Sequence, residues 1–238
     1  MKPIENKKRS QKPIIVVGVL FIAALAALAF VPLIYAMVAG GGGVKTEGID
    51  EARLKPASTD LDGTWTVTSG PGANQSSAGF TFFEILPAEE KVTSGSTRDV
   101  DGDVQIEAGT LRSGEISVDL TTLTTDSDVR DANVQSKILH TETYPEATFT
   151  LTEAADLTHV PDDGSIETVE LTGDLTIHGV TNSITHTFAV ARSGDRLLVA
   201  GGVPINRTDY GVETPDFVAA KIAEDGELNI RLNLRKTD

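Results

Sequence analysis

Residues 168–177 read TVELTGDLTI, and residues 228–235 read LNIRLNLR. In both stretches apolar side chains alternate with polar ones, so that successive side chains point to opposite faces of an extended chain. One apolar and one polar face per strand are typical of an antiparallel sheet that covers a core on one side. These stretches therefore predict half-buried antiparallel strands.

The same period of two recurs along the chain from residue 61 onward. It appears at Trp65 and Val67, at Phe80 and Phe82, at Ile116, Val118 and Leu120, at Phe149 and Leu151, and at Ile184, Phe188 and Val190. Turn-forming residues separate these runs at residues 161–164, 193–195 and 224–227. About eight strands with short connections predict an all-β domain over residues 61–238, either a closed barrel or a sandwich.

Two segments interrupt the alternation. Residues 128–139 read DVRDANVQSKIL, with an acidic start, no glycine or proline, and Val134, Ile138 and Leu139 at helical spacing. They predict one short helix that closes an end of the barrel. Residues 206–217 predict a loop with at most one turn of helix.

The N-terminal part of the chain has a different character. Residues 14–39 are 26 residues without a charged side chain, about 39 Å as a helix and enough to cross a hydrocarbon core of about 30 Å. We expect a single transmembrane helix here. A cleaved signal peptide is the alternative, although its apolar region is normally only about 7 to 15 residues long.

A basic cluster at residues 7–9 precedes this span, so the positive-inside rule places the N-terminus in the cytoplasm and the β-domain outside the cell membrane. The expected order is a basic cytoplasmic tail over residues 1–13, the span over residues 14–39, a glycine-rich flexible linker over residues 40–60, and the β-domain over residues 61–238.

Charge and composition exclude several functions. Residues 40–238 carry 15 basic and 34 acidic side chains, a net charge of −19, which repels phosphate backbones, so no nucleic-acid partner is expected. The chain has no cysteine, so it has no disulfide, thiolate metal site or thiol nucleophile.

Catalytic and metal-binding motifs are missing too. There is no GxSxG elbow, HExxH, phosphate loop or dinucleotide fingerprint. Residues 99–103 resemble the start of a calcium loop, but Val104 stands where glycine is needed, so a solvated turn is expected. No metal and no cofactor are therefore predicted.

Two histidines fall within predicted strands. His186 falls on the apolar face between Ile184 and Phe188, where a hydrogen-bonded core imidazole and a ligand contact are both open. His178 falls on the polar face of its strand, where we expect a hydrogen bond at the strand end.

Two arginines lie beside carboxylates where the strand pattern is interrupted, as Arg130-Asp131 and as Arg207-x-Asp209. Arginine suits a bidentate, partly buried partner. These pairs either fix the helix and the late loop to the end of the barrel or contact a polar ligand head group.

Three blocks of this sequence resemble the YceI-like, polyisoprenoid-binding proteins. Residues 173–181 (GDLTIHGVT) match that family's GDLTIxGVT signature without a gap. Arg130-Asp131 followed by residues 144–149 (YPEATF) resembles its Arg-Asp and YPxxxF block, and residues 205–211 (INRTDYG) resemble its IxRxDFG block. The likeness spans about residues 61–234.

The resemblance implies a lipocalin-like antiparallel barrel with an apolar tunnel that holds a long isoprenoid chain, of quinone or polyprenyl type, and no established catalytic activity. This chain departs from the family at two places. Ile138-Leu139 stand where the family usually has an aromatic pair, and Glu84 stands where many members carry histidine. The candidate ligand-binding residues are Phe80, Phe82, Phe149, Ile177, Ile184, His186 and Phe188 along the interior, and Arg130, Arg207, Asp209 and Tyr210 at the mouth.

Two other functions stay open at this point. The domain could be a stress-protective or interaction domain whose barrel is filled by its own side chains, or an enzyme that uses His186 with an acidic partner inside a cavity. The sequence does not specify the oligomeric state, and a homodimer is among the assemblies that it allows.

Overall fold

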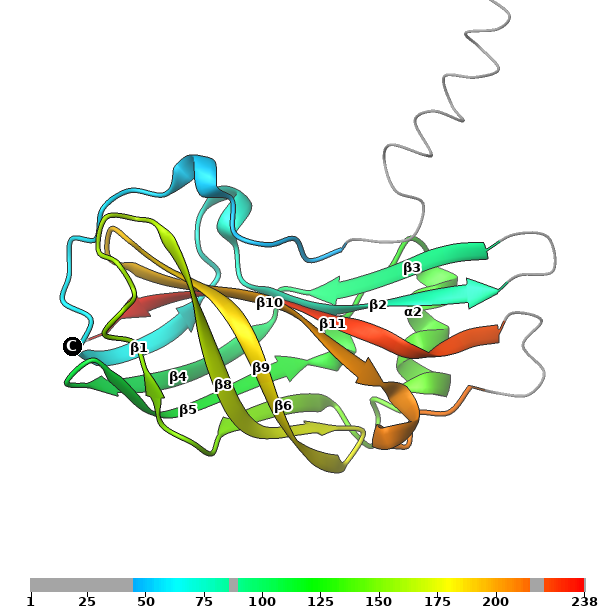
Figure 1. Ribbon diagram of the computed structural model, residues 1–238. Coiled ribbons are helices and arrows are strands. Elements are labelled where there is room, and N and C mark those ends of the chain that lie inside the picture. The colour runs from blue at the N-terminus through cyan, green and yellow to red at the C-terminus, as the bar shows by residue number, and fades with distance from the viewer. Residues whose placement is uncertain (1–44, 86–89, 215–220, 238) are drawn as a thin grey trace, which may run out of the picture. The chain divides into compact units, whose positions relative to one another are not determined.

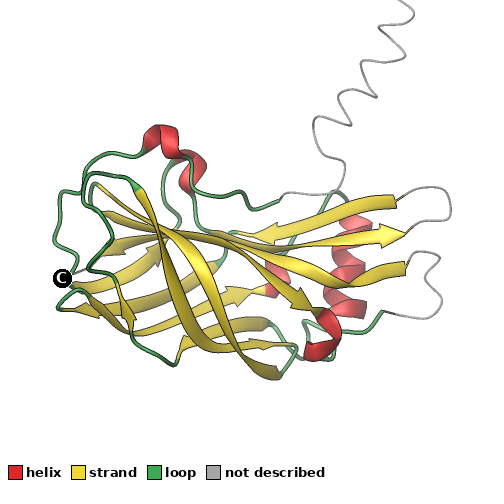
Figure 2. Ribbon diagram, viewed as in Figure 1, coloured by secondary structure: helices red, strands yellow, loops and turns green. Residues whose placement is uncertain are grey.

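The computed structural model describes residues 45–85, 90–214 and 221–237. In this part of the chain, eleven strands form one antiparallel sheet (Figures 1 and 2). They are β1 (Gly63–Thr68), β2 (Ser77–Ile85), β3 (Glu90–Thr97), β4 (Val100–Glu107), β5 (Thr110–Asp119), β6 (Glu146–Leu151), β7 (Ala155–Asp156), β8 (Ile166–Ile177), β9 (Val180–Ser193), β10 (Arg196–Asn206) and β11 (Lys221–Lys236). The predicted all-β class is confirmed.

The sheet closes on itself through eight strands. The order β1-β4-β5-β6-β8-β9-β10-β11 returns to β1, because β1 pairs with β4 on one side and with β11 on the other. The predicted antiparallel barrel of about eight strands is therefore confirmed. The short strand β7 pairs with β5 outside this ring.

Strand β11 changes its neighbour along one edge. Its C-terminal end pairs with β1, from Trp65↔Lys236 to Thr68↔Asn233, whereas its N-terminal part pairs with β2. Strands β2 and β3 continue the sheet beyond the ring as a hairpin, visible on the right of Figure 1. The barrel thus has a closed end at β1 and a second end, here called the mouth, where the β2–β3 hairpin takes the place of β1 and β4.

A short helix lies at the mouth. Helix α2 (Asp128–Asn133) continues into one wider turn of π-helix (Val134–Ile138), and Leu139 is its C-cap. Ser127 is the N-cap, and its side chain accepts a hydrogen bond from the backbone N–H of Arg130. The prediction of one helix over residues 128–139 is confirmed. The 3-10 helices are Glu51–Arg53, Gly72–Asn74, Leu120–Thr122 and Arg207–Tyr210, the last within the predicted loop.

The signature block forms the β8–β9 hairpin. Ile177 pairs with Val180, which leaves His178 and Gly179 as a two-residue loop, and both have positive φ (52° and 75°). A two-residue loop with φ > 0 at both positions matches the twist of the flanking strands, which explains the glycine. At the other end of the block, a Cβ on Gly173 would overlap the ring of Phe149, so this glycine makes room for an aromatic side chain.

Two predicted turns are wrong. Residues 224–227 lie inside β11, where the register with β2 shifts between Ile222 and Gly226. A Cβ at Gly226 would overlap the ring of Phe82, so this glycine serves packing within a strand. Residues 100–103 lie in β4 and pair with β5, so the acidic run 99–103 is mostly strand.

Residues 45–60, assigned to a linker from the sequence, are hydrogen-bonded to the barrel. Ala57 N–H donates to the carbonyl of Asp162 (2.7 Å), and Ser58 N–H donates to the carbonyl of Gly194 (2.8 Å). The hydroxyls of Thr46 and Ser77 lie 2.7 Å apart. This stretch therefore packs as part of the β-domain.

The expected transmembrane helix, residues 14–39, lies outside the described residues. Among the helices of the described ranges, none is long and apolar enough to cross a bilayer.

Candidate functional site

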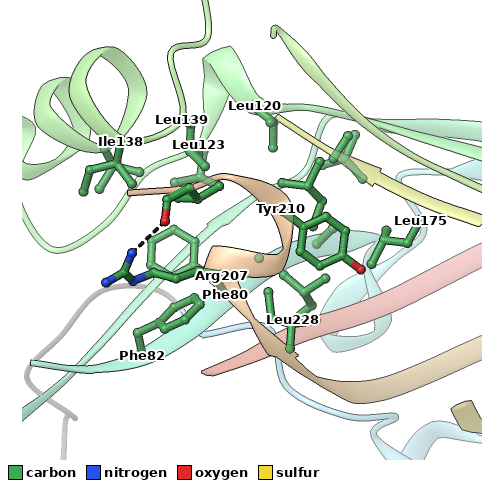
Figure 3. A pocket seen from close by; sticks show the side chains of 18 of the residues that line it. Phe80, Phe82, Leu120, Leu123, Ile138, Leu139, Leu175, Arg207, Tyr210 and Leu228 are labelled. Carbon is green, nitrogen blue, oxygen red and sulfur yellow. Dashed lines mark hydrogen bonds between the residues drawn. The ribbon is translucent and has the colours of Figure 1, made fainter. Parts of the chain in front are cut away.

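The interior of the barrel is hollow at the mouth. A cavity of about 180 Å³, here called the outer cavity, is partly open to solvent and almost wholly apolar. Figure 3 shows side chains from the helix, the strands and the Arg207–Tyr210 turn arranged around it. Its wall includes Phe80, Phe82, Leu120, Leu123, Val134, Ile138, Leu139, Phe149, Leu175, Ile177, Ile205, Tyr210, Val212 and Leu228. For scale, an apolar cavity of about 150 Å³ takes up benzene in another protein.

A second apolar cavity of about 110 Å³, the inner cavity, lies towards the closed end. Residues such as Leu111, Val169, Val190 and Leu197 line it, and they belong to the buried core around Trp65. Six side chains line both cavities: Ile116, Phe149, Leu175, Leu228, Ile230 and Leu232. These six residues, here called the shared wall, border both cavities.

The structure brings most of the candidate residues into these cavities. Phe80, Phe82, Phe149, Ile177, Arg207 and Tyr210 line the outer cavity, and Ile184, Phe188 and again Phe149 line the inner one. Arg130, Asp209 and His186 line neither. The ring of His186 packs nearly perpendicular to that of Phe188, at 5.1 Å between centroids. His186 thus contacts a residue of the inner cavity without lining the cavity itself.

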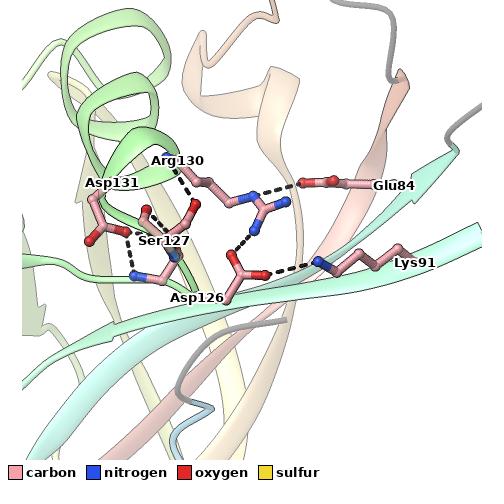
Figure 4. A network of polar contacts seen from close by, with 7 residues as sticks. Glu84, Lys91, Asp126, Ser127, Arg130 and Asp131 are labelled. Carbon is pink, nitrogen blue, oxygen red and sulfur yellow. Dashed lines mark hydrogen bonds and ion pairs between the residues drawn. The ribbon is translucent and has the colours of Figure 1, made fainter. Parts of the chain in front are cut away.

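Arg130 is engaged in a polar network beside the mouth (Figure 4). Its guanidinium forms ion pairs with Glu84 (3.8 Å) and with Asp126, and Lys91 pairs with Asp126 at 2.9 Å. These contacts join helix α2 to the ends of β2 and β3. Asp131 also acts structurally, since its carboxylate accepts hydrogen bonds from the backbone N–H and the hydroxyl of Thr125.

Arg207 fixes the late loop to β11. Its guanidinium donates to the backbone carbonyls of Val212 (2.6 Å), Ala223 (3.1 Å) and Ile222 (3.4 Å), and it lies 3.5 Å from the hydroxyl of Thr214. Arg207 lines the outer cavity, and its guanidinium is hydrogen-bonded within the protein. Arg130 and Arg207 thus fix the helix and the late loop to the barrel, which is one of the two roles that the sequence left open for them.

Tyr210 closes the wall between the loop and the strands. The side chain is buried, and burial raises the pKa of its phenol above the ordinary value. The neutral phenol therefore contributes an apolar ring to the cavity at ordinary pH.

The predicted hydrogen bond of His178 is found, with an unexpected partner. His178 Nε2 lies 2.9 Å from His140 Nδ1, and the ring of Tyr144 packs on His178 at 4.5 Å between centroids. This contact joins the residue after the helical segment to the β8–β9 turn. Across the described ranges, no three His, Asp or Glu side chains gather into a metal-binding group.

Sequence reasoning missed four polar residues of the outer cavity: Glu84, Thr93, Thr148 and Thr214. Glu84, which departs from the family pattern, and Thr93 are the two buried ones among them, at 8% and 3% exposed. Thr93 lies opposite Phe82 in the β2–β3 ladder. The alternation of β2 places Glu84 on the same face as Phe80 and Phe82, which is the signal that could have found it.

An eight-stranded antiparallel barrel, hollow along its interior and covered at one end by a helix, defines the lipocalin-like class. The profile of the YceI-like domain matches residues 65–234. The chain therefore belongs to the YceI-like family.

Relatives of known sequence agree with this assignment. A UPF0312 protein of Pseudomonas syringae pv. syringae is 31% identical over 145 residues, which cover 57% of this chain and 72% of that protein. Protein YceI of Escherichia coli O17:K52:H18 is 32% identical over 104 residues, 42% of this chain and 50% of that protein.

Solved structures share the fold. A polyisoprenoid binding domain from Saccharophagus degradans superposes with a TM-score of 0.56 at 18% identity, covering 73% of this chain and 98% of that one. Burkholderia cenocepacia BcnA gives a TM-score of 0.50 at 22% identity, with 67% and 96% covered. At these identities the likeness concerns the fold alone.

Proposed function

We propose that this protein binds an isoprenoid lipid, of quinone or polyprenyl type, with the tail in the outer cavity of the barrel. The observation that carries the proposal is the cavity itself, about 180 Å³ of apolar space that the protein's own side chains leave unfilled at the mouth. The polyisoprenoid-binding structural neighbour and the YceI-like family add support.

The energetics suit an apolar tail. Each buried methylene contributes about 0.8 kcal/mol, so one isoprene unit of five carbons contributes roughly 3 to 4 kcal/mol before the ordering of the ligand is subtracted. A few units suffice for useful affinity without polar contacts. A protein filled by its own side chains would have no such space, and His186 lines neither cavity, so binding accounts for the site better than the two alternatives do.

The proposal includes the location. The apolar span of residues 14–39 holds the chain in the cell membrane, with the N-terminus in the cytoplasm and the acidic barrel outside. Protease added to intact cells should then remove the barrel while a fragment containing residues 1–39 stays in the membrane fraction. A barrel that survives protease until the cells are broken contradicts this orientation.

Extraction tests the binding. The full chain, purified in detergent from its own organism and extracted with organic solvent, should yield an isoprenoid lipid near one molecule per chain by mass analysis. Leu228→Trp, which fills the cavity from the shared wall, should lose that lipid, while Glu170→Trp, at an exposed position of β8, should keep it. The absence of lipid from the wild type, or its retention by Leu228→Trp, contradicts the proposal.

A further inference from the structure

Exposed apolar side chains gather at the mouth of the barrel. Among the described residues, the large apolar side chains that are exposed are Phe83 (59%), Val92 (41%), Val129 (74%) and Val180 (37%). Phe83 and Val92 lie on the β2–β3 hairpin, and Val129 lies on helix α2 at the same end (Figure 1). Val180 pairs with Ile177, which lines the outer cavity. These side chains thus belong to the end at which the outer cavity opens.

Phe83 and Val92 form a small apolar patch. They are directly opposite in the β2–β3 ladder, so their side chains share one face of the sheet. Their chain neighbours Phe82, Glu84 and Thr93 line the outer cavity, whereas Phe83 and Val92 line neither cavity. The patch therefore lies on the outer face of the hairpin. Single exposed apolar side chains are ordinary, whereas apolar patches mark contacts with proteins or membranes.

The described chain begins beside this patch. Lys45 Nζ lies 3.7 Å from Glu227 Oε1. Glu227 is opposite Thr81 in the ladder of β11 and β2, so the two share a face. Phe83 is two residues further along β2, about 7 Å away and on that same face. Lys45 is therefore held on the outer face of the sheet, next to the patch.

The length of chain before Lys45 limits the distance from the patch to a bilayer. In the proposed location the span ends at residue 39, and residues 40–44 join it to Lys45. Five residues reach at most about 18 Å when fully extended. The patch can therefore reach the surface of the same bilayer that the span crosses.

The charges beside the patch suit a lipid surface without net charge. Lys91 pairs with Asp126, and Arg130 pairs with Glu84 and Asp126, so these charges compensate one another. The chain beyond residue 39 carries 15 basic and 34 acidic side chains, and this excess of negative charge repels anionic lipid. An apolar contact with zwitterionic lipid is therefore favoured over electrostatic attachment.

From these observations we infer that the Phe83–Val92 patch docks on a zwitterionic lipid surface and holds the mouth of the barrel at the bilayer from which a prenyl tail enters. The inference rests on the proposed function, because it assumes the lipid ligand and the location given there. Phe83 and Val92 contact the membrane, and neither contacts the bound tail.

A tryptophan in the patch tests the docking. The full chain is reconstituted in phosphatidylcholine vesicles whose acyl chains carry bromine, which quenches tryptophan emission on contact. The wild type has one tryptophan, Trp65, which is buried at the closed end and should not be quenched. In Phe83→Trp the added tryptophan should lose about half of its emission, because a docked side chain reaches the boundary of the acyl chains. Thr187→Trp, at an exposed position of β9, is the matched control and should lose none.

A charge in the patch locates the effect. Val92→Glu, made together with Phe83→Trp, should reduce the quenching about fivefold or more, because a carboxylate resists transfer out of water. Thr187→Glu with the same reporter should leave the quenching unchanged. Since Phe83 and Val92 line neither cavity, every variant should bind tritiated geranylgeraniol in detergent as the wild type does, which also shows that it is folded.

The outcomes separate two failures. Absence of quenching in Phe83→Trp, equal quenching in Thr187→Trp, or no change on Val92→Glu overturns the docking and leaves the tail-binding proposal standing. A dimer in detergent that Val92→Glu dissociates, without quenching in vesicles, also overturns it, since the patch is then a contact between two copies. If the patch is quenched and the wild type binds no geranylgeraniol, the contact with the bilayer stands and the proposed function fails.

Discussion

The two ends of this barrel share strand β11 but differ in the strand that pairs with it and in how their side chains pack. At the closed end β11 pairs with β1, and Trp65, Ile106 and Leu234 are each 1% exposed. At the mouth β11 pairs with β2, and cavity-lining residues such as Phe82 and Leu228 are only partly buried. The closed end thus combines the most deeply buried core residues with the smaller cavity, while the mouth has the larger and partly open space that a ligand needs.

The largest expected difference between the ends is in stability. Trp65→Ala should lower the free energy of unfolding by about 3–5 kcal/mol, because it leaves a large void in a packed core. Phe82→Ala should lower it by about 1 kcal/mol, since Phe82 already borders a cavity. Urea denaturation of the full chain measures both. Equal losses would contradict the difference between the two ends.

The next effect concerns the shared wall. Phe149→Ala removes part of the wall between the two cavities, so a longer tail should reach the inner one, and the affinity ratio of geranylgeraniol to farnesol should rise about tenfold. Phe188→Ala is the matched control, because Phe188 lines only the inner cavity. A similar rise in both variants would show that the wall does not limit tail length.

A smaller effect concerns the helix at the mouth. Ser127→Ala removes the side-chain acceptor for Arg130 N–H and should destabilise helix α2 by about 1 kcal/mol. Amide hydrogen exchange over residues 128–138 should accelerate about fivefold, while exchange in β10 stays unchanged. Acceleration spread evenly over both regions would mean that the mouth does not open separately from the closed end.

The smallest effect depends on pH. Because burial raises the pKa of Tyr210, the unfolded chain loses this proton first as the pH rises past about 10. The contribution of the neutral phenol to stability is complete below that pH and is lost as the pH rises towards the folded-state pKa. Tyr210→Phe should therefore flatten the alkaline fall in stability measured by urea denaturation at about pH 9 to 11. An unchanged slope would contradict this.

The sequence predicts those parts of the fold that depend on local patterns. Alternation identified the strands that hold Phe80, Phe149 and Leu228, and spacing identified the helix over residues 128–139, because these features depend on near neighbours in the chain. The closure of β11 on β1 depends on residues about 170 positions apart, from Trp65 to Lys236, and no local pattern specifies it.

The sequence also did not predict that some polar residues on the outer face of the strands are buried. Asn233 alternates onto the polar face of β11, yet it is 1% exposed, because residues 74–76 cover it. Its side-chain amide donates to the carbonyl of Asn74 and its oxygen accepts from Arg196. Only the tertiary structure brings these partners together, so residues 232–234 of β11, which look half-buried in sequence, are buried on both faces of the strand.

The sequence predicted only part of the candidate site, because some of its residues follow from local patterns and others are placed only by the tertiary structure. The aromatic residues of the interior followed from alternation, Arg207 followed from its place beside Asp209 where the strand pattern is interrupted, and Tyr210 followed from the family resemblance. The volume of the two cavities depends on how side chains from nine strands and a helix fail to fill the interior, which a sequence pattern does not encode. Thr93 lies in a polar stretch, EKVTSGST, where only its pairing with Phe82 reveals that it faces inward.

Photolabelling tests most directly whether a prenyl tail occupies the hollow mouth. A prenyl alcohol carrying a diazirine on its tail is irradiated with the full chain, and the labelled residues are mapped by mass spectrometry. We expect labels on outer-cavity residues such as Phe80, Leu175 and Leu228, and their loss when excess geranylgeraniol is present. Labels confined to exposed apolar side chains such as Phe83, which is 59% exposed, would contradict the account.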